Sequence, residues 1–282
     1  MFMRVITHSG SIRDVAKYFQ YSLEIVSRYF NLVLDSFFSL MDESSQVPTA
    51  STDALGAING THISAIISQD KHERFINHKG QISQNVMLVV EFDGIINFVV
   101  AGWGGSTSDM SVLRWSLENI SFAVPNVMST GKYYLVDSGY ANTDCFIAPY
   151  RTARYHLSNY REPSQRTYEK KEEVYNHQHA QRRNIVERTF GILKKKFRIL
   201  TEMKQFSFKT QVKIIIICAI IYNFILRNKG IEDLSVTEEP FEMIVSPHEY
   251  DEMLPDQSVR SENLIGDKRH GERLRKIITE KL

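Results

Sequence analysis

The sequence predicts an α/β fold in which helices flank a mixed β-sheet, with a short all-α segment in front of it. Three observations lead to this prediction. Three short runs rich in β-branched residues follow one another with turns between them, which is typical of consecutive antiparallel strands. A further strand pattern comes after one helical pattern, and two long helical patterns follow it. Strands and helices in this order build a sheet that helices cover.

Residues 11–40 contain two helical patterns that meet at a short polar joint, and Ser22 is placed to cap the second helix. The pattern is that of a helix-turn-helix pair. A generic helical hairpin explains it at least as well, because no Gly marks the turn and the exposed charges of the second helix are mixed. The pair lies so close to Met1 that we expect no helix before it. Residues 1–45 are therefore predicted to be a shortened helix-turn-helix-like segment that packs or docks a partner and does not read bases by itself.

The sheet is expected after a polar linker. Its four strands are predicted at residues 54–67, 85–92, 95–101 and 132–140. A turn at 93–94 joins the second strand to the third, and Ser108 is placed to cap a helix that begins at Asp109. Asp137 and a Gly turn end the fourth strand. The first three strands are thus predicted to form an antiparallel meander, to which the fourth is added after the helix.

Two long helices and a tail follow. Residues 176–200 carry the core-facing stripe of an amphipathic helix, formed by Val186, Phe190, Leu193, Phe197 and Leu200. Residues 209–229 are apolar nearly all round, which predicts a buried helix, although their Ile run also allows a strand. Residues 231–282 are acidic and then basic, and are predicted to be a partly disordered tail. The predicted organisation is a segment at 1–45, a domain at 53–230 and a tail at 231–282.

The composition is that of a globular protein inside the cell. Hydrophobic residues make up 43% of the 282 residues, which is ample for a packed core. The two cysteines stand outside any motif and the N-terminus has no apolar signal core, so we expect a reducing compartment. The longest apolar run, 214–226, is 13 residues long and falls below the roughly 18 that span a bilayer, so no membrane is expected.

The formal net charge of +1 hides a strong segregation of charge. Residues 231–257 hold nine acids and no Lys or Arg, whereas the helix at 176–200 holds seven cations and a single acid, Glu187. These cations are Arg182, Arg183, Arg188, Lys194, Lys195, Lys196 and Arg198. A solvated basic face with one incidental Glu is the common explanation of such a run. Helix geometry, however, is expected to align Arg183, Glu187, Gly191, Lys194 and Arg198 along one side. An acid ringed by cations suits a metal ion and a phosphodiester backbone.

Six motifs follow one another as they do in the PIF/Harbinger class of DDE transposases, and the chain most resembles their plant members and the host proteins domesticated from them. The motifs are GAINGTHI (56–63), RFINHKGQISQNV (74–86), GWGGSTSDMSVLR (102–114), YYLVDSGYANTDCFIAPYRTARYHL (133–157), RRNIVERTFGILKKKFRIL (182–200) and FKTQVKIIIICAIIYNFI (208–225). The resemblance covers residues 53–228 and is specific, because all six occur in the right order. The N-terminal helical pair is also similar to that family's N-terminal region.

The resemblance implies an RNase H-like nuclease fold in which three acids bind two Mg²⁺ or Mn²⁺ ions for DNA strand cleavage and transfer. Matched residue by residue, the second acid is Asp137 of VDSGY and the third is Glu187 of VERTFG. The first should be the Asp of a GAIDGTH motif, and this chain has Asn59 there. The resemblance also implies DNA as a partner, a nuclear location and a separate Myb-like DNA-binding protein, and it leaves room for an oligomer.

Asn59 weakens the metal site that the resemblance implies. Two-metal catalysis uses carboxylates that neutralise and bridge cations about 3.5–4 Å apart, and Mg²⁺ favours anionic oxygen ligands. An Asn side chain offers only a neutral carbonyl oxygen and an NH₂ group that repels a second ion. Taken by itself, Asn59–Gly60 is a strong signal of a tight hairpin turn. With Thr61 and His62 of the motif in place, we interpret Asn59 as a decayed first metal ligand.

Other polar residues are weaker candidates. Asp109 stands where the family usually shows the Asp of a His-Asp pair, and it either helps the site or only caps its helix. His62 is a candidate for a supporting hydrogen bond beside the site, or a buried, hydrogen-bonded His. His177 and His179 point away from each other on a helix, cannot share one metal and are expected to be solvated. Tyr222 stands where a His is common and is expected to pack.

The sequence leaves two functions open. The first is a transposase-derived, divalent-metal-dependent DNA endonuclease whose metal site is impaired at Asn59. The second is a non-catalytic nuclear protein that keeps the nuclease fold as a scaffold for DNA, chromatin or a partner protein. Asn59 favours the second function, whereas the intact Asp137 and Glu187 show that decay of the site is not extensive. We expect one weakly bound divalent ion and little strand cleavage.

Overall fold

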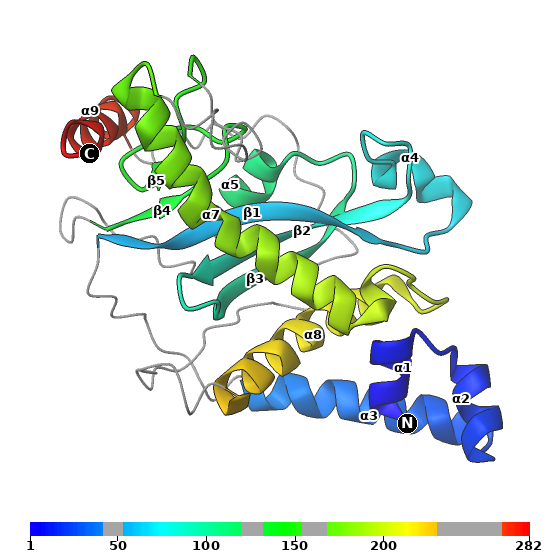
Figure 1. Cartoon of the computed structure of the whole chain (residues 1–282). Helices are drawn as coiled ribbons and strands as arrows, with labels where there is room; N and C mark the ends of the chain where they lie inside the picture. The colour runs from blue at the N-terminus through cyan, green and yellow to red at the C-terminus, as the bar shows by residue number, and fades with distance from the viewer. Residues whose placement is uncertain (42–52, 120–131, 154–167, 230–266) are drawn as a thin grey trace.

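A computed structural model describes residues 1–41, 53–119, 132–153, 168–229 and 267–282. At its centre is a five-stranded sheet with helices on both faces (Figure 1). The strands are β1 (Ala54–Ser64), β2 (Ser83–Glu91), β3 (Ile96–Gly104), β4 (Tyr133–Leu135) and β5 (Phe146–Ile147). The predicted mixed α/β architecture is therefore confirmed, and it is consistent with an RNase H-like fold.

The sheet has the strand order β3-β2-β1-β4-β5. β2 is antiparallel to both β1 and β3, which confirms the predicted meander, whereas β4 and β5 run parallel to β1. The strand predicted at 132–140 is shorter than expected, at Tyr133–Leu135. The sequence missed β5, because a strand of two residues is too short to leave a periodic pattern.

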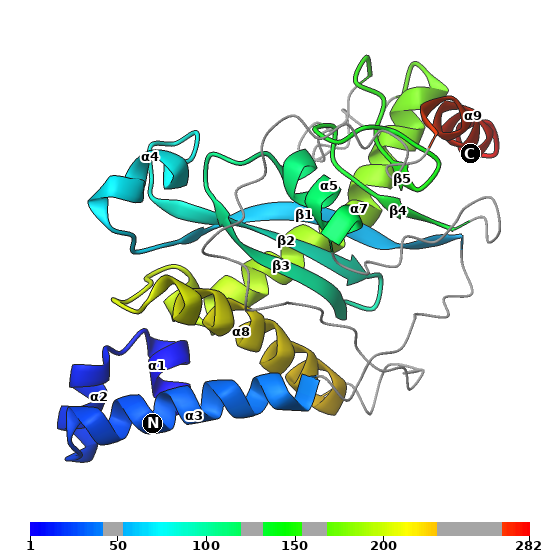
Figure 2. The same ribbon diagram turned by 180° about the vertical axis from the view of Figure 1, so that it is seen from behind.

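Helices cover both faces of the sheet. The longer helices of this domain are α5 (Asp109–Asn119), α7 (Lys171–Lys196) and α8 (Phe208–Lys229). Shorter ones are α4 (His72–Phe75) and two 3₁₀ turns at Gln69–Lys71 and Arg198–Leu200. α7 and α8 lie on one face, and Figure 2 shows α5 on the other. Along β2, Leu88 packs into the core on the α7 side and Met87 into the core on the α5 side. Burial of both faces explains why the middle of β2, residues 86–90, is an unbroken apolar run.

Helix α8 is the buried helix predicted at 209–229, and the alternative of a strand is wrong. By length and composition alone it could cross a membrane, since the window Phe208–Asn228 has a mean hydropathy of 1.7. Here 61% of that window is buried inside the fold, where α8 packs against β3 and α3. A core helix of a folded domain passes the same test.

The N-terminal region folds into α1 (Phe2–His8), α2 (Ile12–Phe19) and α3 (Leu23–Met41). α2 and α3 confirm the predicted helical pair. The expectation that no helix precedes them is wrong, because α1 forms and buries Val5 and Ile6. A seven-residue helix is too short to show a clear helical period in the sequence. The region packs on α8 and the segment before it: Phe30 stacks on Phe206 with ring centroids 5.2 Å apart.

The C-terminal helix α9 (Lys268–Glu280) is an ordered part of the segment that the sequence predicted to be a partly disordered tail. Asp267 caps the helix, and Gly271 lies so close to the backbone of Thr143 that a Cβ there would come within 2.2 Å of its carbonyl carbon. Arg275 donates hydrogen bonds to the carbonyl oxygens of Ala148 and Pro149 just after β5. The sequence suggested a tail because α9 is strongly charged and only a narrow side of the helix carries small or apolar residues. Residues 230–266 lie outside the described part of the chain.

Candidate active site

The parallel pair β1 and β4 brings Asn59 and Asp137 to neighbouring positions. Ala57 lies opposite Leu135 in the register, and Asn59 and Asp137 each follow two residues later. Residues two apart point to the same face of a strand, and adjacent strands lie about 4.8 Å apart. Ala57 and Leu135 pack in the core on the α7 side, while Val136 packs in the opposite core. Both polar side chains are therefore directed to the side of the sheet that α7 covers.

Asn59 lies inside a strand, so its explanation as part of a tight turn is wrong. The ladder between β1 and β2 continues from Gly56 to Ser64 without a shift, with Asn59 opposite Leu88. The side-chain oxygen Oδ1 of Asn59 accepts a hydrogen bond from the backbone N–H of Gly60 at 3.0 Å. Asn59 is half-buried. This hydrogen bond thus holds the Asn59 amide at the edge of the site. Asn59 is not there to form a turn, because the backbone at this position is part of a strand.

Glu187 approaches the same side of the sheet from α7, and Arg183 connects it to Asp137. The guanidinium Nη2 of Arg183 lies 2.7 Å from Glu187 Oε1 and 3.9 Å from Asp137 Oδ1. The carboxylate side chains are 48% and 41% exposed, respectively, whereas the Arg183 side chain is only 13% exposed. Asp137 also accepts a hydrogen bond from the backbone N–H of Ser138 at 2.7 Å. The two predicted acids are therefore brought together, with a guanidinium between them.

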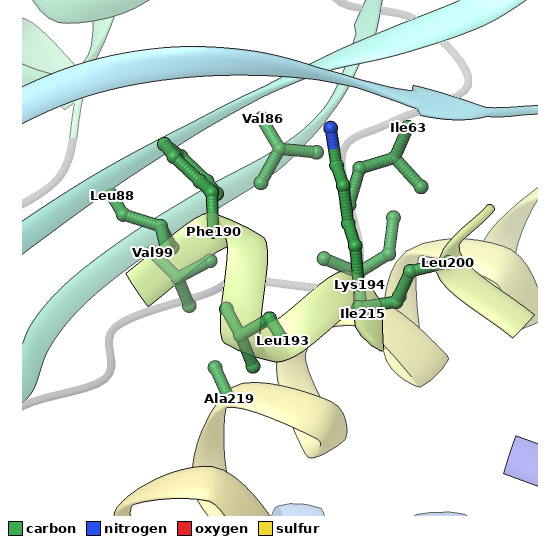
Figure 3. A pocket seen from close by; sticks show the side chains of 10 residues that line it. All are labelled: Ile63, Val86, Leu88, Val99, Phe190, Leu193, Lys194, Leu200, Ile215 and Ala219. Carbon is green, nitrogen blue, oxygen red and sulfur yellow. The ribbon is translucent and has the colours of Figure 1, made fainter. Parts of the chain in front are cut away.

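Lys194 anchors α7 to β1. Its ammonium donates hydrogen bonds to Thr61 Oγ1 at 2.8 Å and to the carbonyl oxygen of His62 at 3.0 Å. Its aliphatic stem lies in a small apolar pocket between the sheet, α7 and α8, beside Ile63 and Val86 (Figure 3). Burial lowers the pKa of Lys194, and the nearby charge of Lys79 lowers it further. Lys194 was predicted to contact DNA, but its charge is directed into the fold.

Asp109 and His62 belong to the opposite face of the sheet. Gly60 lies opposite Met87, which packs on the α5 side, and a Cβ on Gly60 would come within 2.2 Å of Asp109 Oδ1. That oxygen accepts a hydrogen bond from Asn85 Nδ2 at 2.7 Å. Asp109 therefore fills the space that a side chain at position 60 would need. It begins α5, where the preceding Ser108 provides the predicted cap.

The His62 ring packs on the same face of the sheet as Asp109. Its Nδ1 lies 3.2 Å from Ser83 Oγ, and its ring centroid is 5.5 Å from that of His78. Burial lowers the pKa of His62, and the charge of His78 adds to this effect. Of the two roles considered for His62, a partly buried and hydrogen-bonded His fits this environment.

The remaining cations of the basic helix differ in exposure. Arg182, Arg188, Lys195 and Arg198 are exposed, and Lys196 is half-buried. The predicted alignment of Arg198 with the others is wrong, because α7 ends at Lys196 and Arg198 lies in the following 3₁₀ turn. There Arg198 pairs with Glu202 at 2.8 Å. Arg188 and Lys195 lie seven residues apart on α7 and therefore share nearly the same outward face.

Two histidine predictions and one tyrosine prediction have clear outcomes. His179 is not solvated: it is 4% exposed, and its Nε2–H donates to the carbonyl oxygen of Ile147 at 3.0 Å. His177 is partly exposed, so the prediction was wrong only for His179. Tyr222 is buried in the core between the sheet and the helices, as expected for a packing residue.

The side chains of this site that could bind a metal fit one divalent ion better than two. Within the described ranges, no group of three or more His, Cys, Asp or Glu side chains could hold a metal ion. The site offers two half-exposed carboxylates and the neutral amide of Asn59, and Arg183 already neutralises part of their charge. Two-metal chemistry needs bridging carboxylates, so these residues do not fit a metal pair. Sequence reasoning missed the role of Arg183, although its spacing of four from Glu187 indicates an ion pair.

Comparison with known proteins shows which protein family this chain matches. The family described as DDE superfamily endonuclease matches residues 58–223, which is more than half of the chain. Proteins named "Putative nuclease HARBI1" from Homo sapiens, Rattus norvegicus and Bos taurus are each 24% identical to this chain over 228 residues. The match covers 79% of this chain and 60% of each relative, so the chain spans about 60% of their length. No solved structure matches.

Proposed function

The chain belongs to the DDE superfamily of endonucleases, and on that premise we propose that it is a PIF/Harbinger-type nuclease domain that binds duplex DNA but cleaves it poorly. One observation carries the proposal. Asn59 stands beside Asp137 at the end of a parallel strand pair, on the face that Glu187 approaches. This placement supports the match of Asn59 to the first acid of the family motif, although the Asn59 side chain carries no charge.

Asp137 and Glu187 are the residues that would hold a divalent ion, Mg²⁺ or Mn²⁺. Such an ion, when bound, polarises a phosphoryl oxygen and lowers the pKa of a water molecule. The chain's own contribution is positional: the β1–β4 register places Asp137, and the Lys194 hydrogen bonds to Thr61 and His62 fix the α7 segment that follows Glu187. Asn59 supplies no charge toward a second ion. We propose that this centre binds one divalent ion, with weak affinity.

The proposed partner is DNA in the nucleus, with a separate Myb-like protein supplying sequence recognition. Arg188 and Lys195, two of the exposed cations of α7, lie on the helix next to the site and can neutralise phosphates. The alternative function is a non-catalytic scaffold that uses the same basic surface. The ion pair between Arg183 and Glu187 favours it, because the site already has an internal cation.

DNA binding is tested by its salt dependence. Replacing Arg188 and Lys195 together by Ala is expected to reduce the slope of log K against log salt by up to ~1.8, since each phosphate contact contributes about 0.9. Fluorescence anisotropy with labelled duplex DNA at several salt concentrations measures this slope. The matched control is Lys194→Met, whose ammonium is directed into the fold and which should keep the slope. An unchanged slope in the double variant would remove this face of α7 from the proposed DNA contact.

A further inference from the structure

Arg183 is placed to act on both predicted acids at once. One guanidinium nitrogen, Nη2, lies 2.7 Å from Glu187 and 3.9 Å from Asp137. We propose that Arg183 is a built-in counter-ion of this carboxylate pair, so that a divalent cation binds there only against the repulsion of the chain's own guanidinium. This inference rests on the proposed function, which assigns Asp137 and Glu187 as the ligand pair.

The packing of Arg183 keeps its charge in place. The side chain is 13% exposed, whereas an Arg on a free helix surface can move its charge into water. Its second terminal nitrogen, Nη1, is buried and has no hydrogen-bond partner among the described residues. Glu187 lies one helical turn away on the same helix, which fixes the distance between the two charged groups. A divalent cation that enters the site is therefore repelled by a guanidinium charge that packing holds in place.

Arg183 and Asn59 act in the same direction. Two carboxylates and one guanidinium give the site a formal charge of about −1, because Asn59 adds none. A site with three acids and no guanidinium would have a formal charge of about −3. A divalent ion is attracted by this net charge, and the attraction falls with each negative charge lost and each positive charge added. The weak affinity for a divalent ion that we propose thus has two causes, the missing charge at Asn59 and the positive charge of Arg183. Only Asn59 is visible as a departure from the family motif.

The test is metal binding by the full chain without DNA. Isothermal titration with Mn²⁺ compares wild type with Arg183→Gln, Asn59→Asp and the double variant. Arg183→Gln is expected to bind Mn²⁺ about tenfold more tightly than wild type, because a unit charge about 5 Å from a divalent ion is repelled appreciably even at the dielectric constant of water. Arg182→Gln is the matched control: it removes an equal charge from the adjacent, exposed position and should leave the affinity unchanged.

Each outcome is decisive. If Asn59→Asp tightens Mn²⁺ binding but Arg183→Gln does not, Arg183 is no counter-ion and the proposed ligand pair stands. Equal gains in Arg183→Gln and Arg182→Gln would point to general surface charge and also overturn the inference. If none of the variants binds Mn²⁺, the ligand assignment itself fails, and with it the metal part of the proposed function. Circular dichroism checks folding, and Arg183→Met, which keeps the buried stem, replaces Arg183→Gln if that variant does not fold.

Discussion

Replacing Asn59 by Asp is expected to raise Mg²⁺- or Mn²⁺-dependent cleavage of duplex DNA by about 100-fold or more over wild type. The reason is positional. Asn59 and Asp137 are neighbours on parallel strands and face the side from which Glu187 approaches, so the new carboxylate completes a set of three. A catalytic group that is missing or misplaced typically costs a factor of about 10². Cleavage of labelled duplex DNA under single-turnover conditions measures the gain.

The control is the double variant Asn59→Asp/Glu187→Gln, which has the new carboxylate but lacks the third acid and should return to the wild-type rate. Freshly purified wild-type protein is checked by mass spectrometry, because deamidation of Asn59 would produce the same Asp. Strong metal-dependent cleavage by fresh wild type, abolished in Glu187→Gln, would show that Asn59 does not impair the site. No gain in Asn59→Asp would mean that the damage extends beyond position 59, and Arg183 is the first residue to test in combination.

The fold was predictable wherever a segment is long and keeps one period. The β1–β2–β3 meander and helices α5, α7 and α8 were found because their apolar residues repeat along several turns or strand positions. β5 and α1 were missed because two and seven residues are too few to show a period. α9 was assigned to a tail because most of its surface is charged, while a glycine and a few partly apolar residues dock it.

The structure brings some of the predicted site residues together and separates others, and the reason lies in the sheet. Asp137 and Glu187 converge because strand register and helix packing place them on one face, which the motifs of the resemblance anticipated. His62 is only three residues from Asn59, but strand alternation places it on the other face of the sheet. Asp109 begins α5 and lies against Gly60 on that same other face. The inward direction of Lys194 depends on β1 lying beside α7, a tertiary contact that helix geometry alone does not contain.

His179 is expected to make the fold sensitive to mild acid. It is buried where α7 packs on β5, and burial lowers its pKa from an ordinary 6.5 to about 4. Between these values the unfolded chain binds a proton that the folded chain does not, so stability is complete above pH 6.5 and is lost as the pH falls toward 4. The slope is about 1.4 kcal/mol per pH unit, and the total loss approaches about 3 kcal/mol.

Urea unfolding at pH 7 and pH 5 measures this effect. His179→Gln, whose amide can still donate to the carbonyl oxygen of Ile147, is expected to lose about 2 kcal/mol less unfolding free energy than wild type between the two pH values. His177→Gln, two residues earlier on the same helix and partly exposed, should behave like wild type. An identical pH dependence in wild type and His179→Gln would contradict the assignment of a neutral, buried His179.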